Sequence, residues 1–324
     1  MSLSLKKNKM SLPIAFVEGI KGYIYLDLDD FNGTKRLTIP SNFKGTFFPL
    51  ITHKNKNRRN VFFIAGASGC GKSTFARKLV ESYKKMYKKR EIYLISMLKE
   101  DPTIDPINPL RIKISSLVKT PLELEEPDEN DDEDEETFGE IMEDHYNSRL
   151  RPAILQTYRN RLPMKRKQKE QKIEKKEFEP EIQDCMLIAD DVDAIPNKKQ
   201  DKAVLETINK VAITGRHYNI SLVYISHYLS NYHKTRLMHM ESDFIVVFPL
   251  CENKHHFHTV LLKYYSVDEE DRNYIKQSGS RWACISKKFP KYCILENEIF
   301  MLNQQDVQDI NNAGNVLMLG NTKT

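Results

Sequence analysis

A nine-residue run, GASGCGKST at residues 66–74, constrains this chain more than any other feature of its 324 residues. It fits the pattern G-x-x-x-x-G-K-[ST], in which a glycine-rich turn joins a buried strand to the start of a helix. An apolar run, Asn60–Ala65, precedes it, and a helix-forming segment, Lys72–Lys88, follows its lysine. The sequence therefore predicts a loop that binds phosphate groups with backbone N–H groups and the positive end of a helix.

Each residue type in this loop has a physical role. We expect Gly66, Gly69 and Gly71 to adopt positive φ angles and to let backbone N–H groups approach the phosphates with no Cβ in the way. We expect Lys72 to reach the β- and γ-phosphates, and the hydroxyl of Ser73 to bind Mg²⁺. The expected nucleotide contacts are the whole run: Gly66, Ala67, Ser68, Gly69, Cys70, Gly71, Lys72, Ser73 and Thr74.

Two adjacent carboxylates follow a second apolar run, CMLIA at residues 185–189. A phosphate-binding loop of this kind needs a carboxylate at the tip of another core strand, so we expect Asp190 to hold Mg²⁺ through water. We expect Asp191 to be the general base that polarises the attacking water. Asp193, two residues further on, is expected to be a helix-capping or loop residue.

Polar side chains also follow a third apolar run, Ile220–Ser226. Either Ser226 or His227 is expected to sense the γ-phosphate from the end of that strand. Arg216 and Arg236 are candidates for an arginine delivered across a subunit boundary, because a guanidinium stabilises the negative charge of a phosphoryl-transfer transition state. A surface arginine or a contact to a DNA backbone is the alternative interpretation of both residues.

The apolar runs are continuous rather than alternating, which is typical of parallel strands buried on both faces. Their alternation with helices predicts an α/β fold with a mostly parallel central sheet flanked by helices. We expect a small N-terminal β-rich arm or subdomain at 1–57, a P-loop ATPase domain at 58–302 and a C-terminal tail at 303–324. The expected strands are Gly22–Leu28, Arg36–Pro40, Asn60–Ala65, Glu91–Ser96, Leu110–Ser115, Cys185–Ala189, Ile220–Ser226, Asp243–Phe248, Arg281–Ser286, Tyr292–Glu296 and Ile299–Leu302, with a second helix at Lys198–Thr214.

A charged insertion interrupts the predicted ATPase domain at residues 123–180. Residues 123–144 carry fourteen carboxylates and no Lys or Arg, whereas residues 149–176 carry eleven basic residues. Because the acidic run cannot bury enough apolar surface to order itself, we expect a solvated loop followed by a helix within 137–176. The alternative is a DNA-mimicking tether that competes for a basic surface. Without residues 123–176 the net charge rises from +5 to +10, which favours polyanionic partners.

Composition argues against several other classes of protein. No apolar run approaches the roughly 18 residues of a spanning helix, and Leu12–Val17 is too short for a secretory signal. We therefore expect an intracellular protein without a membrane partner. The five cysteines form no C-x-x-C pair, which argues against a disulfide framework or a zinc site. Hydrophobic residues make up 40% of the chain, enough for a sizeable core, so chain-wide disorder is excluded.

Three segments resemble the genome-packaging ATPases of nucleocytoplasmic large DNA viruses, a group within the FtsK–HerA superfamily. They are ISMLKEDPTID at 95–105, CMLIADDVD at 185–193 and TGRHYNISLVYISHYL at 214–229. The later segments DFIVVFP and SGSRWACISKKFPKYCILENEIF also look similar. The resemblance covers roughly residues 60–302 without the insertion, and the GRHYNIS segment is more specific to the group than the phosphate-binding loop.

The resemblance implies a RecA-like core that binds ATP and Mg²⁺, assembles into a homo-oligomeric ring and moves double-stranded DNA into a capsid. It implies that Lys72 and Ser73 bind phosphate and Mg²⁺, and that Asp190 and Asp191 form the acidic Walker B pair. His227 stands where relatives often carry a glutamine sensor. Capsid or portal-like proteins would be further partners, and the protein would lie in the host cytoplasm or the virion.

Two other functions remain open from the sequence. The form GASGCGKST also begins several small-molecule kinases, which need an arginine-containing lid over the transferred phosphoryl group. Residues 149–176 are the lid-like candidate. The second alternative is a partner-regulated NTPase or scaffold that binds proteins through residues 123–176 and is not coupled to DNA. Stimulation of ATP turnover by DNA distinguishes a motor from both.

Overall fold

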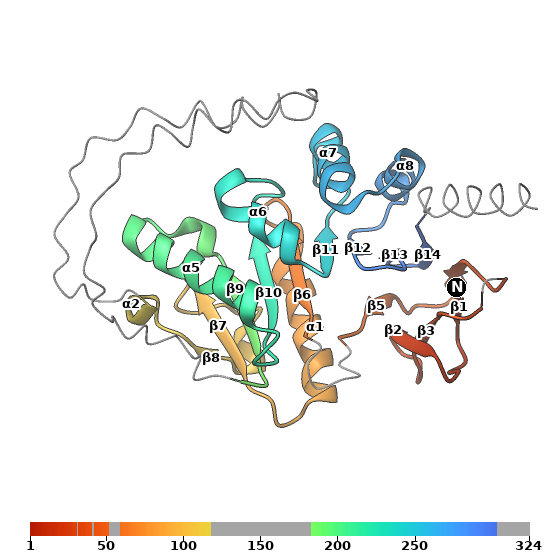
Figure 1. Cartoon of the computed structure of the whole chain (residues 1–324), viewed down its shortest axis with the longest axis horizontal. Helices are drawn as coiled ribbons and strands as arrows, with labels where there is room; N and C mark the ends of the chain where they lie inside the picture. Colours follow the sequence, from red (N-terminus) through yellow and green to blue (C-terminus); the bar gives the residue numbers. More distant parts are fainter. Residues whose placement is uncertain (31, 41, 52–58, 118–182, 303–324) are drawn as a thin grey trace, which may run out of the picture. The chain divides into compact units, whose positions relative to one another are not determined.

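A computed structural model describes residues 1–30, 32–40, 42–51, 59–117 and 183–302. All of these residues belong to one compact unit of the chain. Its centre is a ten-stranded sheet in the order β4-β14-β13-β12-β11-β6-β10-β9-β7-β8 (Figure 1). The bounds of these strands are β4 Arg36–Thr38, β6 Val61–Ala65, β7 Ile92–Ser96, β8 Leu110–Arg111, β9 Met186–Asp190, β10 Ser221–Ser226, β11 Phe244–Val247, β12 Ala283–Ser286, β13 Tyr292–Leu295 and β14 Glu298–Met301.

The sheet is mixed, with a parallel half and an antiparallel half. The six strands from β11 to β8 are parallel, whereas β12, β13, β14 and β4 continue the sheet in antiparallel pairs. In a parallel sheet the carboxyl ends of all strands meet at one edge, where α/β folds bind their ligands. The expected α/β fold with a mostly parallel central sheet is confirmed.

Helices follow most of the parallel strands. They are α1 Lys72–Met86, α2 Ile114–Leu117, α5 Lys198–Thr214, α6 Tyr232–Glu241, α7 Lys254–Tyr265 and α8 Glu269–Gln277, with the short 3₁₀ turns η1 Asp105–Ile107 and η2 Val192–Ala194. The side-chain oxygens of Asn197, Asn231 and Asn253 accept backbone N–H bonds at the first turns of α5, α6 and α7. The predicted bounds of α5 are confirmed, and α1 ends two residues earlier than expected.

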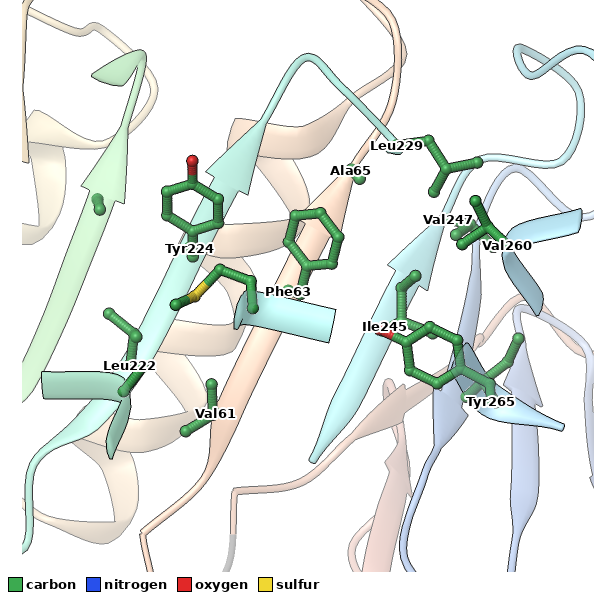
Figure 2. Close-up of a cluster of buried hydrophobic side chains, with 14 of the residues drawn as sticks. Val61, Phe63, Ala65, Leu222, Tyr224, Leu229, Ile245, Val247, Val260 and Tyr265 are labelled. Carbon is green, nitrogen blue, oxygen red and sulfur yellow. The ribbon is translucent and has the colours of Figure 1, made fainter. Parts of the chain in front are cut away.

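The continuous apolar runs arise because both faces of the sheet are covered. Val61, Phe63 and Ala65 of β6 belong to the buried cluster that contains residues of α5, α6 and α7 (Figure 2). Phe62 and Ile64 belong to a second cluster, which contains residues of α1. All five side chains are at most 1% exposed, so no position on this strand is left for a polar residue.

The N-terminal region forms a second sheet of four antiparallel strands in the order β1-β3-β2-β5. Its strands are β1 Ser2–Ser4, β2 Ser11–Val17, β3 Ile24–Asp27 and β5 Phe47–Pro49. Phe48 of β5 packs with its ring centroid 4.8 Å from that of Phe75 in α1 and 5.7 Å from that of Trp282. The same region donates β4 to the edge of the large sheet, beside β14. The expected N-terminal β-rich zone is therefore present and is joined to the main sheet.

One strand prediction is wrong in part. The run Leu110–Ser115 forms only the two-residue strand β8, and residues 114–117 turn into the short helix α2. Among the described residues, β8 pairs with the single strand β7 at this outer end of the sheet. The predicted insertion at 123–180, its helix within 137–176 and the tail at 303–324 lie outside the described residues. Within residues 1–30, 32–40, 42–51, 59–117 and 183–302, no helix is long and apolar enough to cross a membrane.

Candidate active site

The glycine-rich loop turns from the end of β6 into the start of α1. Gly69 and Gly71 have φ angles of 77° and 104°, the left-handed region in which only glycine is unstrained. Gly66 is not among the positive-φ glycines, so that expectation is wrong. Space requires glycine there instead, because a Cβ on Gly66 would lie 2.9 Å from the ring of Phe248 and 2.9 Å from Cys70 Sγ.

Lys72 begins α1 and folds back over the loop. It is 6% exposed, and its ammonium donates to the carbonyl oxygens of Gly66 at 2.8 Å and Ala67 at 3.0 Å. Its third contact is with Nδ1 of His227, at 3.3 Å. A buried ammonium held at the mouth of a loop of backbone N–H groups is positioned to meet phosphate oxygens.

Ser73 and Asp190 meet although 117 residues separate them in the sequence. The Ser73 hydroxyl donates to Asp190 Oδ2 at 3.3 Å, from the first turn of α1 to the last residue of β9. Burial, together with the nearby carboxylates of Asp191 and Asp101, raises the pKa of Asp190 to about 7. None of the ion pairs among the described residues includes Asp190. A buried carboxylate beside a hydroxyl, without a basic partner, fits a hard divalent cation such as Mg²⁺.

Asp191 and His227 form a hydrogen-bonded pair next to Lys72. Asp191 Oδ1 lies 3.0 Å from His227 Nε2, and the two side chains are 27% and 36% exposed. Because the ammonium of Lys72 can only donate, Nδ1 of His227 accepts from it, and Nε2–H therefore donates to Asp191. Asp191 has a φ of 54°, a conformation uncommon for a residue with a side chain, at the point where β9 turns into η2.

The structure thus brings together the residues that the sequence assigned to phosphate, Mg²⁺ and water. Lys72 and Ser73 come from α1, Asp190 and Asp191 from the end of β9, and His227 from the end of β10. These strands are parallel and neighbouring, so their ends lie at one edge of the sheet. The expected proximity is observed, and the chemical roles stay predictions.

Two further carboxylates near this edge were not assigned to the chemistry of the site from the sequence. Asp101, which is 6% exposed, accepts from the backbone N–H groups of Thr103 and Ile104 at 2.7 and 3.2 Å in the loop after β7. The Asp-Pro-Thr sequence is a turn signal that could have located it. Asp193 was expected to be a helix-capping or loop residue; it lies in the turn η2, where its carboxylate accepts from the Ser226 hydroxyl at the end of β10 and from the backbone N–H of His227.

Of the two candidates for sensing γ-phosphate, His227 is the one that faces the loop. Ser226 is fully buried, and its hydroxyl donates to Asp193 Oδ2 at 2.7 Å. Its carbonyl oxygen accepts from the backbone N–H of Gly66 at 3.2 Å, which fixes the loop to β10. Ser226 therefore supports the loop and the histidine.

Of the two predicted arginines, Arg216 lies away from this edge of the sheet. Arg216 is exposed in the turn between α5 and β10, so it stands at the start of β10, and His227 follows the end of that strand. It lines a cavity of about 480 Å³ with Arg59 and Asp243, which precede β6 and β11. Arg236 is exposed on α6. A contribution from either residue to a neighbouring subunit stays a prediction.

The GRHYN segment has a structural role at that opposite end of the sheet. Gly215 ends α5, and a Cβ there would lie 2.5 Å from the carbonyl oxygen of Val211. Arg59 donates to the carbonyl oxygens of Val211 and Ala212 in the last turn of the same helix. Asn219, with a φ of 55°, donates to Asp184 Oδ1 at 2.6 Å. These contacts join the end of α5 to the starts of β6, β9 and β10.

Comparison with known proteins gives one similar sequence and several similar structures. No family model matches the chain. The chain is 26% identical over 299 residues to the uncharacterised protein V3 of Sputnik virophage, which covers 90% of this chain and 96% of V3. Because protein V3 is itself uncharacterised, this similarity does not indicate a function.

Two solved structures illustrate the structural likeness. The genome packaging NTPase B204 from Sulfolobus turreted icosahedral virus 2, in complex with AMP, is 12% identical with a TM-score of 0.37, over 72% of this chain and 94% of B204. The pCW3 conjugation coupling protein TcpA with ATPγS is 11% identical with a TM-score of 0.38, over 89% and 76% of the two chains. The neighbours thus include a viral genome-packaging NTPase, the kind of protein that the sequence motifs resemble. Because these identities and TM-scores are low, the proposed hydrolysis rests on the geometry of this chain's own site.

Proposed function

We propose that this chain is an ATP-hydrolysing motor that moves double-stranded DNA and packages a viral genome into a capsid. One observation carries the hydrolytic part of the proposal. Nδ1 of His227 lies 3.3 Å from the Lys72 ammonium, and Nε2 lies 3.0 Å from Asp191. A phosphate-binding lysine, a histidine and a carboxylate in one hydrogen-bonded chain form a site that can bind a γ-phosphate and take a proton from water.

The residues divide the work by their positions. The loop N–H groups and Lys72 bind the phosphates, and Lys72 stabilises the charge on the transferred phosphoryl group. Asp191, which is partly exposed, accepts the proton of the attacking water while His227 Nε2–H keeps its carboxylate in place. Ser73 and Asp190 would hold Mg²⁺, which when bound neutralises charge on the β- and γ-phosphate oxygens. Aspartate is one methylene shorter than glutamate, so the water binds closer to β9.

The DNA-moving part of the proposal is supported by the sequence resemblance and by charge. Outside residues 123–176 the chain has a net charge of +10. A positive net charge favours binding to the phosphates of DNA. Lys198, Lys199 and Lys202 are exposed on the first turn and a half of α5, directly after η2 and the carboxylate pair. Movement of β9 on hydrolysis would reach these lysines first. A ring of several copies would let Arg216 or Arg236 act on a neighbour's nucleotide.

The first experiment measures ATP hydrolysis by the purified full chain with and without long linear double-stranded DNA. We expect several-fold stimulation by DNA, and a log–log salt dependence of DNA binding with a slope of about −0.9 for each phosphate neutralised. Lys72→Ala should abolish turnover. Lys85→Ala, which removes an exposed lysine from the same helix, is the matched control and should keep wild-type turnover. Turnover that depends on Lys72 but ignores DNA would contradict the motor.

A second experiment separates movement from simple stimulation. A labelled third strand bound to the duplex is displaced when a motor passes along the DNA, so release that requires ATP and Lys72 reports translocation. If DNA-independent turnover coincides with phosphorylation of an added nucleoside or sugar, the chain is a kinase. If nucleotide binds and neither turnover nor phosphorylation is found, the chain is a partner-regulated scaffold.

A further inference from the structure

Asp193 bridges the ends of two neighbouring strands and takes no part in the proposed chemistry. It belongs to η2, three residues after Asp190 at the end of β9. Its carboxylate accepts from three donors of β10 and the residue after it: Ser226 Oγ at 2.7 Å, the His227 backbone N–H at 2.9 Å and the Tyr224 hydroxyl at 3.3 Å. A carboxylate with several short, charge-assisted bonds fixes the geometry of its donors.

The turn that carries Asp193 is itself fixed. The Lys234 ammonium at the start of α6 donates to the Asp193 carbonyl oxygen at 3.1 Å and to Asp201 Oδ1 of α5 at 3.2 Å. Burial raises the pKa of Tyr224 well above its usual value, and the charge of Asp193 raises it further, so the Tyr224 hydroxyl stays a donor. Asp193 is thus held from β9, α5 and α6 while it holds the end of β10.

The position of the His227 ring depends on this contact. Asp193 binds the backbone N–H of His227, one residue after the hydroxyl of Ser226, which also accepts from the Tyr228 N–H at 3.0 Å. Both backbone N–H groups of the turn are therefore satisfied through Asp193 or its direct partner. The ring that leaves this fixed backbone reaches Lys72 on one side and Asp191 on the other. Without Asp193, the backbone N–H of His227 would lose this acceptor, and the ring would keep only its own contacts with Lys72 and Asp191.

We propose that Asp193 is a positioning residue that places the His227 ring between Lys72 and Asp191, and so couples the carboxylate strand β9 to the sensing strand β10. The kinetic test of this proposal rests on the proposed ATPase activity, whereas the spectroscopic test does not. Displacing a group by about 1 Å in an active site can cost on the order of 100-fold in rate. The expected signature is therefore a fall in kcat with little change in nucleotide binding, because the loop and Lys72 keep their own bonds.

The kinetic test uses the full chain and a double-mutant cycle. Asp193→Ala should lower kcat by about 10–100-fold, with less than about a threefold change in KM for ATP. Asp193→Asn keeps one acceptor oxygen and should recover part of the loss. In a His227→Ala background, Asp193→Ala should cost nothing further, because the two residues act as one unit. An equal loss in both backgrounds, or no recovery with asparagine, would overturn the proposal.

A matched control tests whether any buried carboxylate at a strand end has this effect. Asp243 Oδ2 accepts from the backbone N–H of Val61 at 2.9 Å, at the opposite end of β6. Asp243→Asn should lower the melting temperature and leave kcat unchanged. A loss of kcat equal to that of Asp193→Ala would show that Asp193 acts through general stability, which would also overturn the proposal.

A spectroscopic measurement keeps the test independent of turnover. In ¹⁵N-labelled histidine spectra, with the His227 signals assigned by their absence in His227→Ala, the wild-type ring should show a protonated Nε2 and an unprotonated Nδ1. Asp193→Ala should move these signals toward those of a mixture of the two neutral tautomers, and Asp243→Asn should leave them in place. An unchanged His227 spectrum in Asp193→Ala refutes the positioning role even if the chain hydrolyses no ATP. A wild-type protein without turnover but with the expected spectral change would refute only the proposed function.

Discussion

The substitution Asp190→Asn tests the electrostatics of the site directly. Asp190 is 2% exposed, and burial together with Asp191 and Asp101 raises its pKa from 3.8 to about 7. In the unfolded chain the carboxyl group returns to its ordinary pKa. The folded protein therefore holds a proton between these two values that the unfolded chain has lost, and stability falls as the pH rises through this window.

The size of the effect follows from the shift in pKa. A shift of about 3 units corresponds to at most about 4 kcal/mol in the free energy of unfolding, lost between about pH 4 and pH 7. Between about pH 5 and pH 8, a range suited to measurement, the wild type loses about 2.5 kcal/mol of its free energy of unfolding through this group. Asparagine cannot ionise, so the variant avoids this loss. It gives up one acceptor of the two used by Ser73 and the Asp191 N–H, a constant cost of about 1 kcal/mol.

The assay is thermal unfolding of both proteins in EDTA across this pH range. The difference in melting temperature between Asp190→Asn and the wild type should shift by roughly 5–10 °C in favour of the variant as the pH rises from about 5 to 8. Adding Mg²⁺ and ATP should stabilise the wild type and reduce this advantage, because only the wild type keeps the carboxylate ligand. A difference between the two proteins that is the same at both pH values would refute the assignment of a buried, ionisable Asp190.

Three further substitutions test the packing around the site. Phe48→Ala should lower the free energy of unfolding by about 3–5 kcal/mol in chemical denaturation, because it removes a ring that packs against three other aromatic rings. Gly66→Ala should weaken binding of a fluorescent ADP by about tenfold or more, because the new Cβ meets the Phe248 ring and displaces the loop at a cost of about 1–3 kcal/mol. Arg59→Met should cost about 1–3 kcal/mol of stability by freeing the last carbonyls of α5, and steady-state kinetics should show an unchanged KM for ATP.

The sequence was informative where a residue's role depends on local order. The loop at 66–74 follows one strand and starts one helix, so its conformation is encoded within about twenty residues. The meeting of Lys72, Asp190 and His227 followed from a general property of parallel strands, whose carboxyl ends share an edge. These expectations needed no knowledge of which strands are neighbours beyond the alternation of strands and helices.

The hydrogen-bond partners and packing of individual side chains could not be predicted from the sequence. Asp193 was expected to be a helix-capping or loop residue because acidic residues are common just before helices. Its hydrogen-bond partners on and after β10 lie 33 and 34 residues further on. The strand expected at Leu110–Ser115 has an apolar pattern, but a strand at the outer end of a sheet gains only one row of hydrogen bonds. Gly66 was assigned a positive φ from its residue type, whereas the packing of Phe248 decides its identity.

The pairing of β4 with β14 gives the chain an unusual order of events during synthesis. Residues 36–38 pair with residues 298–300, so about 260 residues of chain separate the two partners. A ribosome adds roughly 5–20 residues per second, so β4 waits on the order of tens of seconds before its partner exists. Phe48 can pack on α1 well before then, since Phe75 follows it by only 27 residues. The strand β4 is thus synthesised early but paired last. If a ribosome stalls before residue 298, β4 is left without β14 and can pair with other chains.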